Sequence, residues 1–308
     1  MKKSYFALAA ALAVAGSAQA AVLYTTDFET PQGANFTSAI SSADTEFNYS
    51  FNYAAYVPTT PTTALTIPAA PSGSGTTGLM IRANFDGTAT NEGATAYINA
   101  GAGKTNYVLK FDAYQMFNGA VALGVPQAPN TTVGMAMGNA APSSAMHSGA
   151  TAFTGWFIMI TPEGGNGTTD VRYYSGTGAA PVNANTTPDW RINGGTVLPT
   201  GMPGTATEWP LVFPATDPNV LVPGCPGRQW VTWEVTSLGG NVSVKVTPVG
   251  GPTTTIASWA QANNNTPGVG FFDPNTGSVV DPLDSFVVID NLTLTEPSEA
   301  SEGWALYN

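Results

Sequence analysis

Short runs in which apolar and polar residues alternate recur along this chain, and they constrain its fold more than any other feature. In residues 107–112, Tyr107, Leu109 and Phe111 alternate with Lys110 and Asp112. A period of two is typical of a β-strand with one buried face. The same pattern, or a short continuous apolar run, marks the ranges 22–28, 78–85, 155–160, 171–174, 230–236, 242–247 and 286–295.

The composition argues against helices between these runs. Only 9% of the 308 residues are charged, and Lys and Arg total nine, whereas helix surfaces are usually built from Lys, Glu and Arg. The 34 Gly and 24 Pro residues gather in Thr- and Asn-rich stretches, chiefly 57–78, 124–152 and 176–227. Residues 237–240, Ser-Leu-Gly-Gly, indicate a hairpin. We therefore expect an all-β fold, a two-sheet antiparallel jelly-roll sandwich with long loops.

The first twenty residues indicate export. Lys2 and Lys3 precede the apolar run 6–15, and residues 18–20 form a small-x-small cleavage site. We expect a signal peptide over 1–20 with cleavage near Ala20–Ala21, a β-sandwich domain over 21–295, and a polar tail over 296–308. The expected location is secreted, or extracellular. No later run reaches the ~18 apolar residues of a membrane helix, so we expect no membrane insertion.

The charge balance excludes some partners. Without Lys2 and Lys3, seven of the nine basic residues remain against 20 acidic ones, a net charge near −13. Nucleic acid and anionic lipid both need a basic surface, so neither is expected as a partner. Cys225 is the only cysteine, so no intrachain disulfide can form. It is either a half-buried thiol or the site of an intermolecular bridge.

Carboxylates near the two ends of the predicted domain suggest a cation. In a regular strand Asp290 would share a face with Val288, Leu292 and Leu294, and a buried charge is costly unless it is paired, hydrogen-bonded or metal-bound. Sandwich folds often pair their first and last strands, which would bring Asp27 and Glu29 near Asp290. These three are candidate ligands for a structural Ca²⁺; the acidic loop residues Asp273, Asn275, Asp281 and Asp284 offer another oxygen-rich set. Alternatively, Asp290 accepts backbone N–H bonds in a turn or bulge and Asp27 caps a loop.

Several motifs, taken in order, resemble one family. They are residues 26–29 (TDFE), 46–53 (EFNYSFNY), 75–82 (GTTGLMIR), 107–112 (YVLKFD), 155–160, 164–174, 230–246, 268–274 (GVGFFDP) and 286–291 (FVVIDN). The chain resembles secreted concanavalin-A-like (LamG/jelly-roll) bacterial surface or extracellular proteins. The resemblance implies two packed antiparallel sheets. It assigns no activity, because such jelly rolls serve as lectin-like modules and adhesins and, in other branches, as polysaccharide lyases and glucanases.

Catalytic motifs of those branches are absent from the sequence. The E-x-D-x-x-E strand of the glucanases, which sets carboxylates on either side of the sugar bond, does not occur. A lyase groove for acidic sugars needs many basic residues, and the net charge opposes one. His147 is the only histidine, and no G-x-S-x-G or S-x-x-K accompanies it. We therefore predict a non-catalytic protein, with no catalytic residues assigned; a polysaccharide-degrading enzyme with an unrecognised carboxylate pair remains the alternative.

Loop tryptophans are the candidate ligand contacts. Trp190 is flanked by Asp189 and Arg191, so its ring could stack on a sugar while its neighbours bond the hydroxyls. Trp209 is a second loop tryptophan; the alternative for both is packing of a large apolar ring against a sheet. The predicted function is carbohydrate binding, or contact with an extracellular matrix or surface component. A matrix or surface-layer component that assembles with itself is a further alternative.

Overall fold

The computed structural model describes the greater part of the β-rich chain. The described residues are 20–40, 43–58, 65–84, 90–117, 133–139, 153–160, 162, 171–179, 182–183, 192–193, 196–197, 209–216, 223–261, 266–276 and 282–297. Among them no helix is long and apolar enough to cross a membrane. All but the last residue of the predicted signal peptide, and most of the predicted tail, lie outside these ranges.

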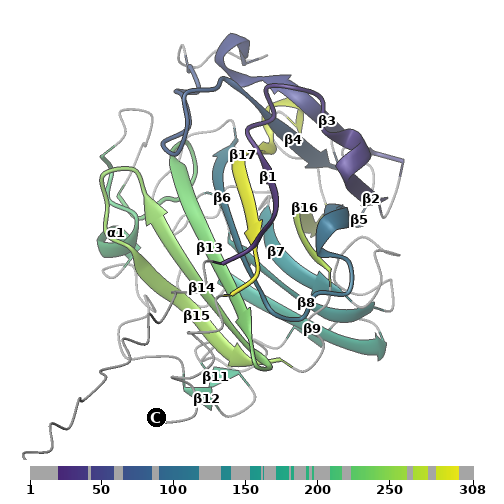
Figure 1. The fold of residues 1–308 in the computed structure, drawn as a ribbon. Coiled ribbons are helices and arrows are strands. Elements are labelled where there is room, and N and C mark those ends of the chain that lie inside the picture. The colour runs from purple at the N-terminus through teal and green to yellow at the C-terminus, as the bar shows by residue number, and fades with distance from the viewer. Residues whose placement is uncertain are drawn as a thin grey trace, which may run out of the picture.

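Eight strands form the first antiparallel sheet (Figure 1). Seven follow the order β15-β14-β13-β6-β17-β4-β3, and β1 adds to β17 beyond the end of its pairing with β4. The first and last strands therefore pair, as the sequence predicted. The strands are β1 (Val22–Thr26), β3 (Thr45–Asn52), β4 (Thr77–Ala83), β6 (Tyr107–Met116), β13 (Trp230–Leu238), β14 (Asn241–Pro248), β15 (Thr254–Ala260) and β17 (Phe286–Thr295).

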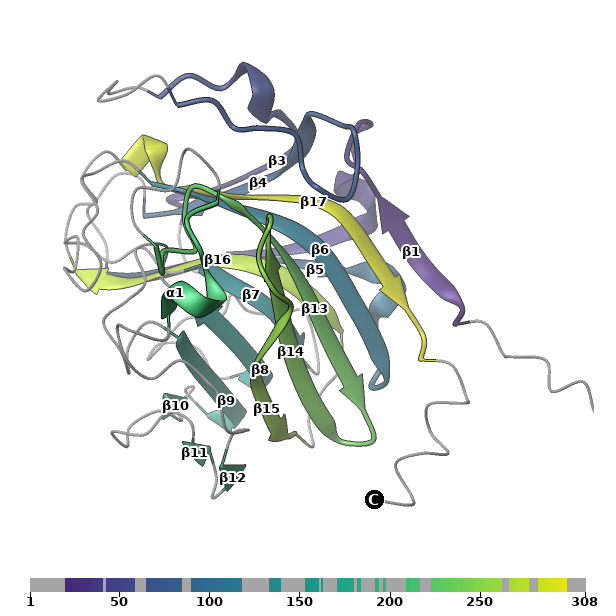
Figure 2. The same ribbon diagram turned by 90° about the vertical axis from the view of Figure 1, so that its left-hand side faces the viewer.

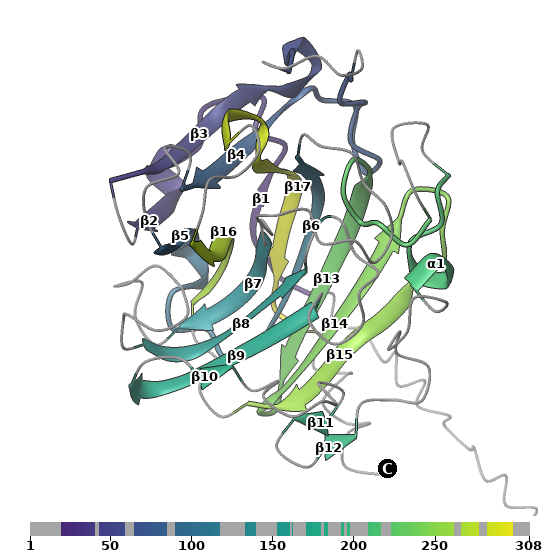
Figure 3. The same cartoon turned by 180° about the vertical axis from the view of Figure 1, so that it is seen from behind.

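Seven strands form the second sheet, in the order β10-β9-β8-β7-β16-β5-β2 (Figure 3). They are β2 (Phe36–Ile40), β5 (Thr90–Ile98), β7 (Val133–Asn139), β8 (Phe153–Ile160), β9 (Val171–Ala179), β10 (Val182–Asn183) and β16 (Pro267–Thr276). A separate ribbon joins β11 (Ile192–Asn193) to β12 (Thr196–Val197). Helices are short: α1 (Trp209–Val212) and the 3₁₀ turns η1 (Gly33–Asn35), η2 (Tyr53–Ala55), η3 (Asn99–Gly101) and η4 (Pro282–Asp284).

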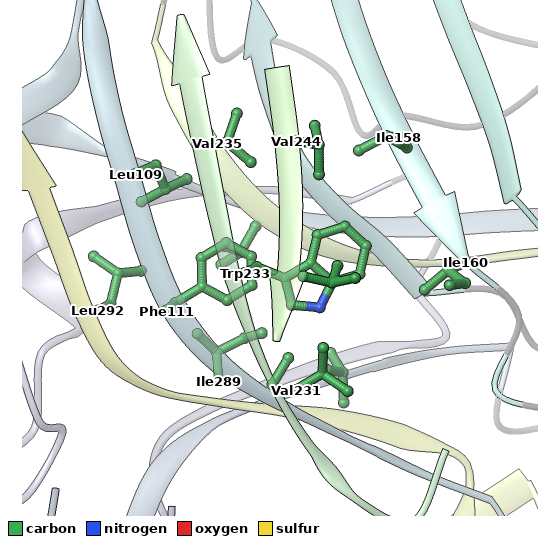
Figure 4. Close-up of a cluster of buried hydrophobic side chains, with 14 of the residues drawn as sticks. Leu109, Phe111, Ile158, Ile160, Val231, Trp233, Val235, Val244, Ile289 and Leu292 are labelled. Atoms are coloured by element: carbon green, nitrogen blue, oxygen red, sulfur yellow. The ribbon is translucent and has the colours of Figure 1, made fainter. Parts of the chain in front are cut away.

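The two sheets face each other as a sandwich (Figure 2), which confirms the predicted fold class. Trp233 of β13 lies in the core between them, with Phe111 stacked on it and Ile158 and Ile160 of β8 on the other side (Figure 4). In β13 buried residues alternate with half-buried ones from Trp233 onward, as expected for a strand with one face in the core.

Local sequence explains some connections and misleads for others. The β13–β14 hairpin turns at Gly239 and Gly240, whose φ angles of 57° and 77° suit a two-residue primed turn. The prediction of a loop over 124–152 is wrong for β7. In that strand Val133, Met135 and Met137 alternate with Gly and Ala, and small residues give a weak strand signal.

Candidate functional site

A second hydrophobic cluster covers part of the first sheet on the side away from the sandwich core. Successive residues of β6 divide between the two sides, since Ala113 belongs to the core and Tyr114 to this outer cluster. Leu65 and Ile67 of the segment before β4 pack in the cluster. Trp230 joins them, and its Nε1 donates to Pro68 O at 2.7 Å. The segment 65–76 is thereby fastened over the outer face of β6, β13 and β17.

Asp112 fixes the polar end of that segment. Its carboxylate is fully buried on the outer side of β6 and accepts four hydrogen bonds. Ser72 donates through its backbone N (3.0 Å) and its Oγ (2.9 Å), Thr232 through Oγ1 (2.6 Å), and Asn291 through Nδ2 (3.0 Å). Charge-assisted bonds of this kind are about twice as strong as neutral ones. Asp112 therefore ties the loop at Ser72, β13 and β17 to one point.

A β-bulge in β17 lies beside Asp112. The pairing of β17 with β6 shifts between Asp290 and Thr293, and Asn291 has a left-handed φ of 49°. Val288 accordingly lies in the outer cluster, whereas Leu292 lies in the core. The common face that the sequence assigned to Asp290, Val288 and Leu292 is therefore wrong, because the bulge reverses the alternation.

Asp290 is buried at this bulge. Tyr53 Oη lies 2.9 Å from its Oδ2, and the Asn291 backbone N donates to its Oδ1 at 2.7 Å. The pKa of Asp290 is raised from 3.8 to about 6: burial is the largest cause, the hydrogen bonds from Tyr53 and Asn291 lower the pKa, and the negative charges of Asp112 and Glu29 raise it. These contacts match the alternative interpretation of Asp290, in which it accepts a backbone N–H at a bulge.

A pocket opens next to the bulge, where the neighbour of β17 changes. β4 pairs with β17 at Val287–Ile289 and β1 pairs with it from Leu292 onward, so Asp290 and Asn291 lie between the two. Figure 1 shows β1 beside β17 on this side of the sheet. The outer-face pocket has a volume of about 410 Å³. It is lined by Thr25, Thr26, Asp27, Ser72, Lys110, Asn291 and Thr293.

Several polar atoms of the lining are uncommitted within the described part of the chain. Asn291 uses its Nδ2 on Asp112, and its Oδ1 accepts no hydrogen bond there. Asp27 accepts the Glu29 N–H through Oδ1 at 3.2 Å, and its Oδ2 accepts none. Thr25 and Thr293 share one hydrogen bond between their hydroxyls, at 3.3 Å. The pocket therefore offers acceptors and hydroxyls held on strands whose positions are fixed from behind.

Glu29 has a different role from Asp27. The Glu29 Oε1 accepts the backbone N–H groups of Thr76 (2.8 Å) and Thr77 (3.0 Å) at the start of β4. A Cβ at Gly75 would lie 2.3 Å from that oxygen, so glycine allows this close approach. Both Asp27 and Glu29 follow the end of β1, in a turn where Phe28 has a φ of 55° and is buried in the core.

The three predicted calcium ligands are near one another but do not converge. Asp290 is behind the pocket, Asp27 is on its wall, and Glu29 caps β4. Within the described ranges no three His, Cys, Asp or Glu side chains are arranged to hold a metal ion. In the other predicted set, Asp284 is buried and accepts a hydrogen bond from Tyr56 Oη. The calcium site stays a prediction.

The predicted aromatic contacts cannot be placed in this pocket. Asp189, Trp190 and Arg191 lie outside the described residues. Trp209 is the first residue of α1, and its side chain is likewise outside the description.

Sequence reasoning missed Ser72, Lys110 and Asn291, which line the pocket, and Asp112, which holds it. The available signal was the polar pair Asp290–Asn291 inside an apolar strand, since Asn is among the residues that most often adopt a left-handed φ.

Comparison with known proteins finds solved structures of similar fold but assigns the chain to no family. No family model and no curated protein matches this chain. A carbohydrate esterase of the Shiga toxin-encoding bacteriophage phi24B is similar, with a TM-score of 0.41 and 12% identity, covering 91% of this chain and 100% of that one. A carbohydrate recognition domain of Emp46p has a TM-score of 0.42 and 8% identity, covering 90% and 97%. The Ca²⁺- and mannose-bound lumenal domain of VIP36 has a TM-score of 0.39 and 8% identity, covering 68% and 75%.

Proposed function

We propose that this protein binds carbohydrate through the outer-face pocket. The observation that carries the proposal is a lining that holds two acceptors without a donor among the described residues, Asn291 Oδ1 and Asp27 Oδ2, beside the hydroxyls of Thr25 and Thr293, which share one hydrogen bond. A sugar presents several hydroxyls close together, each able to donate and accept. Protein acceptors that lack a donor can accept hydrogen bonds from these hydroxyls. Because the scaffold holds the acceptors in place, few side chains have to be ordered on binding.

The size and rigidity of the pocket support the same class of ligand. A volume of about 410 Å³ lies within the ~300–1,000 Å³ of typical small-molecule sites. Asp112 holds Ser72 and Asn291 from behind, so two walls of the pocket are fixed by one buried group. A bound sugar ring would therefore meet a preformed site.

The remaining sequence predictions join this proposal as parts to be tested. Trp190, with Asp189 and Arg191, would add a stacking surface for a longer glycan. A structural Ca²⁺ on Asp27 or Glu29 is likewise a proposal. Export directed by residues 1–20 is another, and the N-terminal sequence of the protein recovered from culture medium tests it.

The test is calorimetric titration with a panel of neutral and acidic oligosaccharides. Asn291→Gly removes the amide while glycine keeps the left-handed backbone, and Asp27→Ala removes an exposed acceptor. We expect each variant to bind about five- to tenfold more weakly, the effect of one lost hydrogen bond. Asn241→Ala removes an exposed asparagine of β14 outside the pocket and should bind as the parent does. If no member of the panel binds, or if neither variant changes the affinity, the pocket is not a carbohydrate site.

A further inference from the structure

Lys110 stands out among the basic residues of this acidic protein. Three described cations have acidic partners: Arg82 with Glu46 (2.5 Å), Lys104 with Glu296 (2.5 Å), and Lys245 with Glu234 (3.1 Å). Arg228 is buried, over the ring of Phe117. Lys110 is exposed, and within the described residues its ammonium has neither an ion pair nor a hydrogen bond.

The sheet register explains why Lys110 has no acidic partner on the described strands beside it. Its neighbour on β13 is Glu234, and the neighbour of Glu234 on β14 is Lys245. The Glu234 carboxylate bonds Lys245, away from Lys110. On the other side of β6 the neighbour of Lys110 is Thr293, a hydroxyl of the pocket lining. The Lys110 ammonium is therefore available to a ligand in the outer-face pocket.

We infer that the ligand of the pocket is an acidic sugar, whose carboxylate pairs with Lys110. This inference rests on the proposed function and narrows its substrate class. An uncommitted cation in a pocket attracts an anionic acceptor, and the acceptors Asn291 Oδ1 and Asp27 Oδ2 attract hydroxyl donors. Asp27 is the other charged residue of the lining and repels a carboxylate, so the two charges orient the ring. The net negative charge of the protein also repels an acidic sugar, but at ~0.15 M ionic strength this repulsion is largely screened beyond ~8 Å, so its effect is smaller than that of Lys110 in contact with the ligand. A uronic acid carries the required carboxylate and hydroxyls on one ring.

A matched pair of ligands tests the inference directly. Oligogalacturonates and their methyl esters differ only in the charge of the carboxyl group, and both are titrated at pH 7. We expect the acid to bind about tenfold more tightly than the ester, as for a hydrogen bond to a charged group. Lys110→Met should abolish that preference. Lys104→Met removes a lysine outside the pocket, one whose partner Glu296 is not a strand neighbour of Lys110, and should retain it. Thermal melts of both variants establish that they are folded.

The outcomes separate this inference from the proposed function. Equal binding of acid and ester, or a preference that persists in Lys110→Met, overturns the acidic-sugar inference while carbohydrate binding stands. Sulfated dextran and dextran are titrated as well. If sulfated dextran binds and the oligogalacturonates do not, the acidic-sugar inference is also overturned. If neutral sugars, acids and esters all fail to bind, the proposed function itself fails.

Discussion

Replacement of Asp290 by asparagine separates two roles that a buried carboxylate can have. Tyr53 Oη lies 2.8 Å from Gly75 O and 2.9 Å from Asp290 Oδ2, and a hydroxyl has one hydrogen. Gly75 O can only accept. When Asp290 is ionised, the Tyr53 hydrogen is shared between these two acceptors; when Asp290 is protonated, it donates to Tyr53 Oη and leaves the Tyr53 hydrogen to Gly75 O. In Asp290→Asn, the amide of the new side chain would donate in the same way, and its oxygen would still accept the Asn291 N–H.

The magnitude follows from the pKa of Asp290. The pKa is raised from 3.8 to about 6, chiefly by burial, so the folded state holds the proton more tightly than the unfolded state. The contribution of Asp290 to stability is therefore full below pH 3.8 and is lost as the pH rises through 6. The total loss is about 3 kcal/mol, at about 1.4 kcal/mol per pKa unit. About half of it falls between pH 5 and pH 8.

Urea denaturation of the parent and Asp290→Asn at pH 5 and pH 8 measures this difference. Relative to the parent, we expect the variant to gain about 1.5 kcal/mol of unfolding free energy from pH 5 to pH 8. Asp27→Asn removes an exposed carboxylate nearby and should show no comparable change. If Asp290→Asn instead loses stability relative to the parent as the pH rises, the anion itself is required. That result would refute the proton argument and favour the calcium ligand predicted from the sequence.

Further perturbations test the other parts of this structure. Asp112→Ala removes the acceptor of the Ser72 backbone N–H and of Asn291 Nδ2, and we expect a loss of about 3 kcal/mol in urea denaturation; a loss under about 1 kcal/mol would contradict the network. Trp233→Ala should cost about 3–5 kcal/mol by the same assay, since it empties the middle of the core. Removal of divalent cations with EDTA should lower the melting temperature, because the proposed Ca²⁺ on Asp27 or Glu29 would bind only the folded state; an unchanged melting temperature would remove that proposal.

The fold could be predicted from the sequence where one strand face is strongly apolar. Each of the eight ranges predicted as strands contains a strand in the structure, and the sandwich follows from these strands. The strands that sequence reasoning missed carry small or mixed side chains. In β5, for example, the core face is made by Ala94, Ala96 and Ile98, and two alanines give little contrast with their neighbours. Packing against the second sheet, which no local pattern reveals, determines that this stretch is extended.

The pocket could not be predicted because its residues meet only through long-range pairing. Ser72 reaches β6 because the segment 65–76 is fastened over the outer cluster, and Lys110 has no ion pair among the described residues because Glu234 bonds Lys245. Neither fact depends on neighbours in sequence. The prediction that the first and last strands pair was the one non-local step available, and it correctly placed Asp27 beside β17.

The bulge at Asn291 connects the fold to the site. Before the bulge, Val288 faces the outer cluster and β17 pairs with β4; after it, Leu292 faces the core and β17 pairs with β1. Regular alternation already serves both sides in β6; in β17 the bulge changes which residues face the core, from Val287 and Ile289 before it to Leu292 and Leu294 after it, and the polar residues fall at that break. Asp290 and Asn291 therefore do not interrupt an apolar strand at random. The place where they lie is also the place where β17 exchanges neighbours, and a gap between β4 and β1 at that point is what leaves room for the pocket.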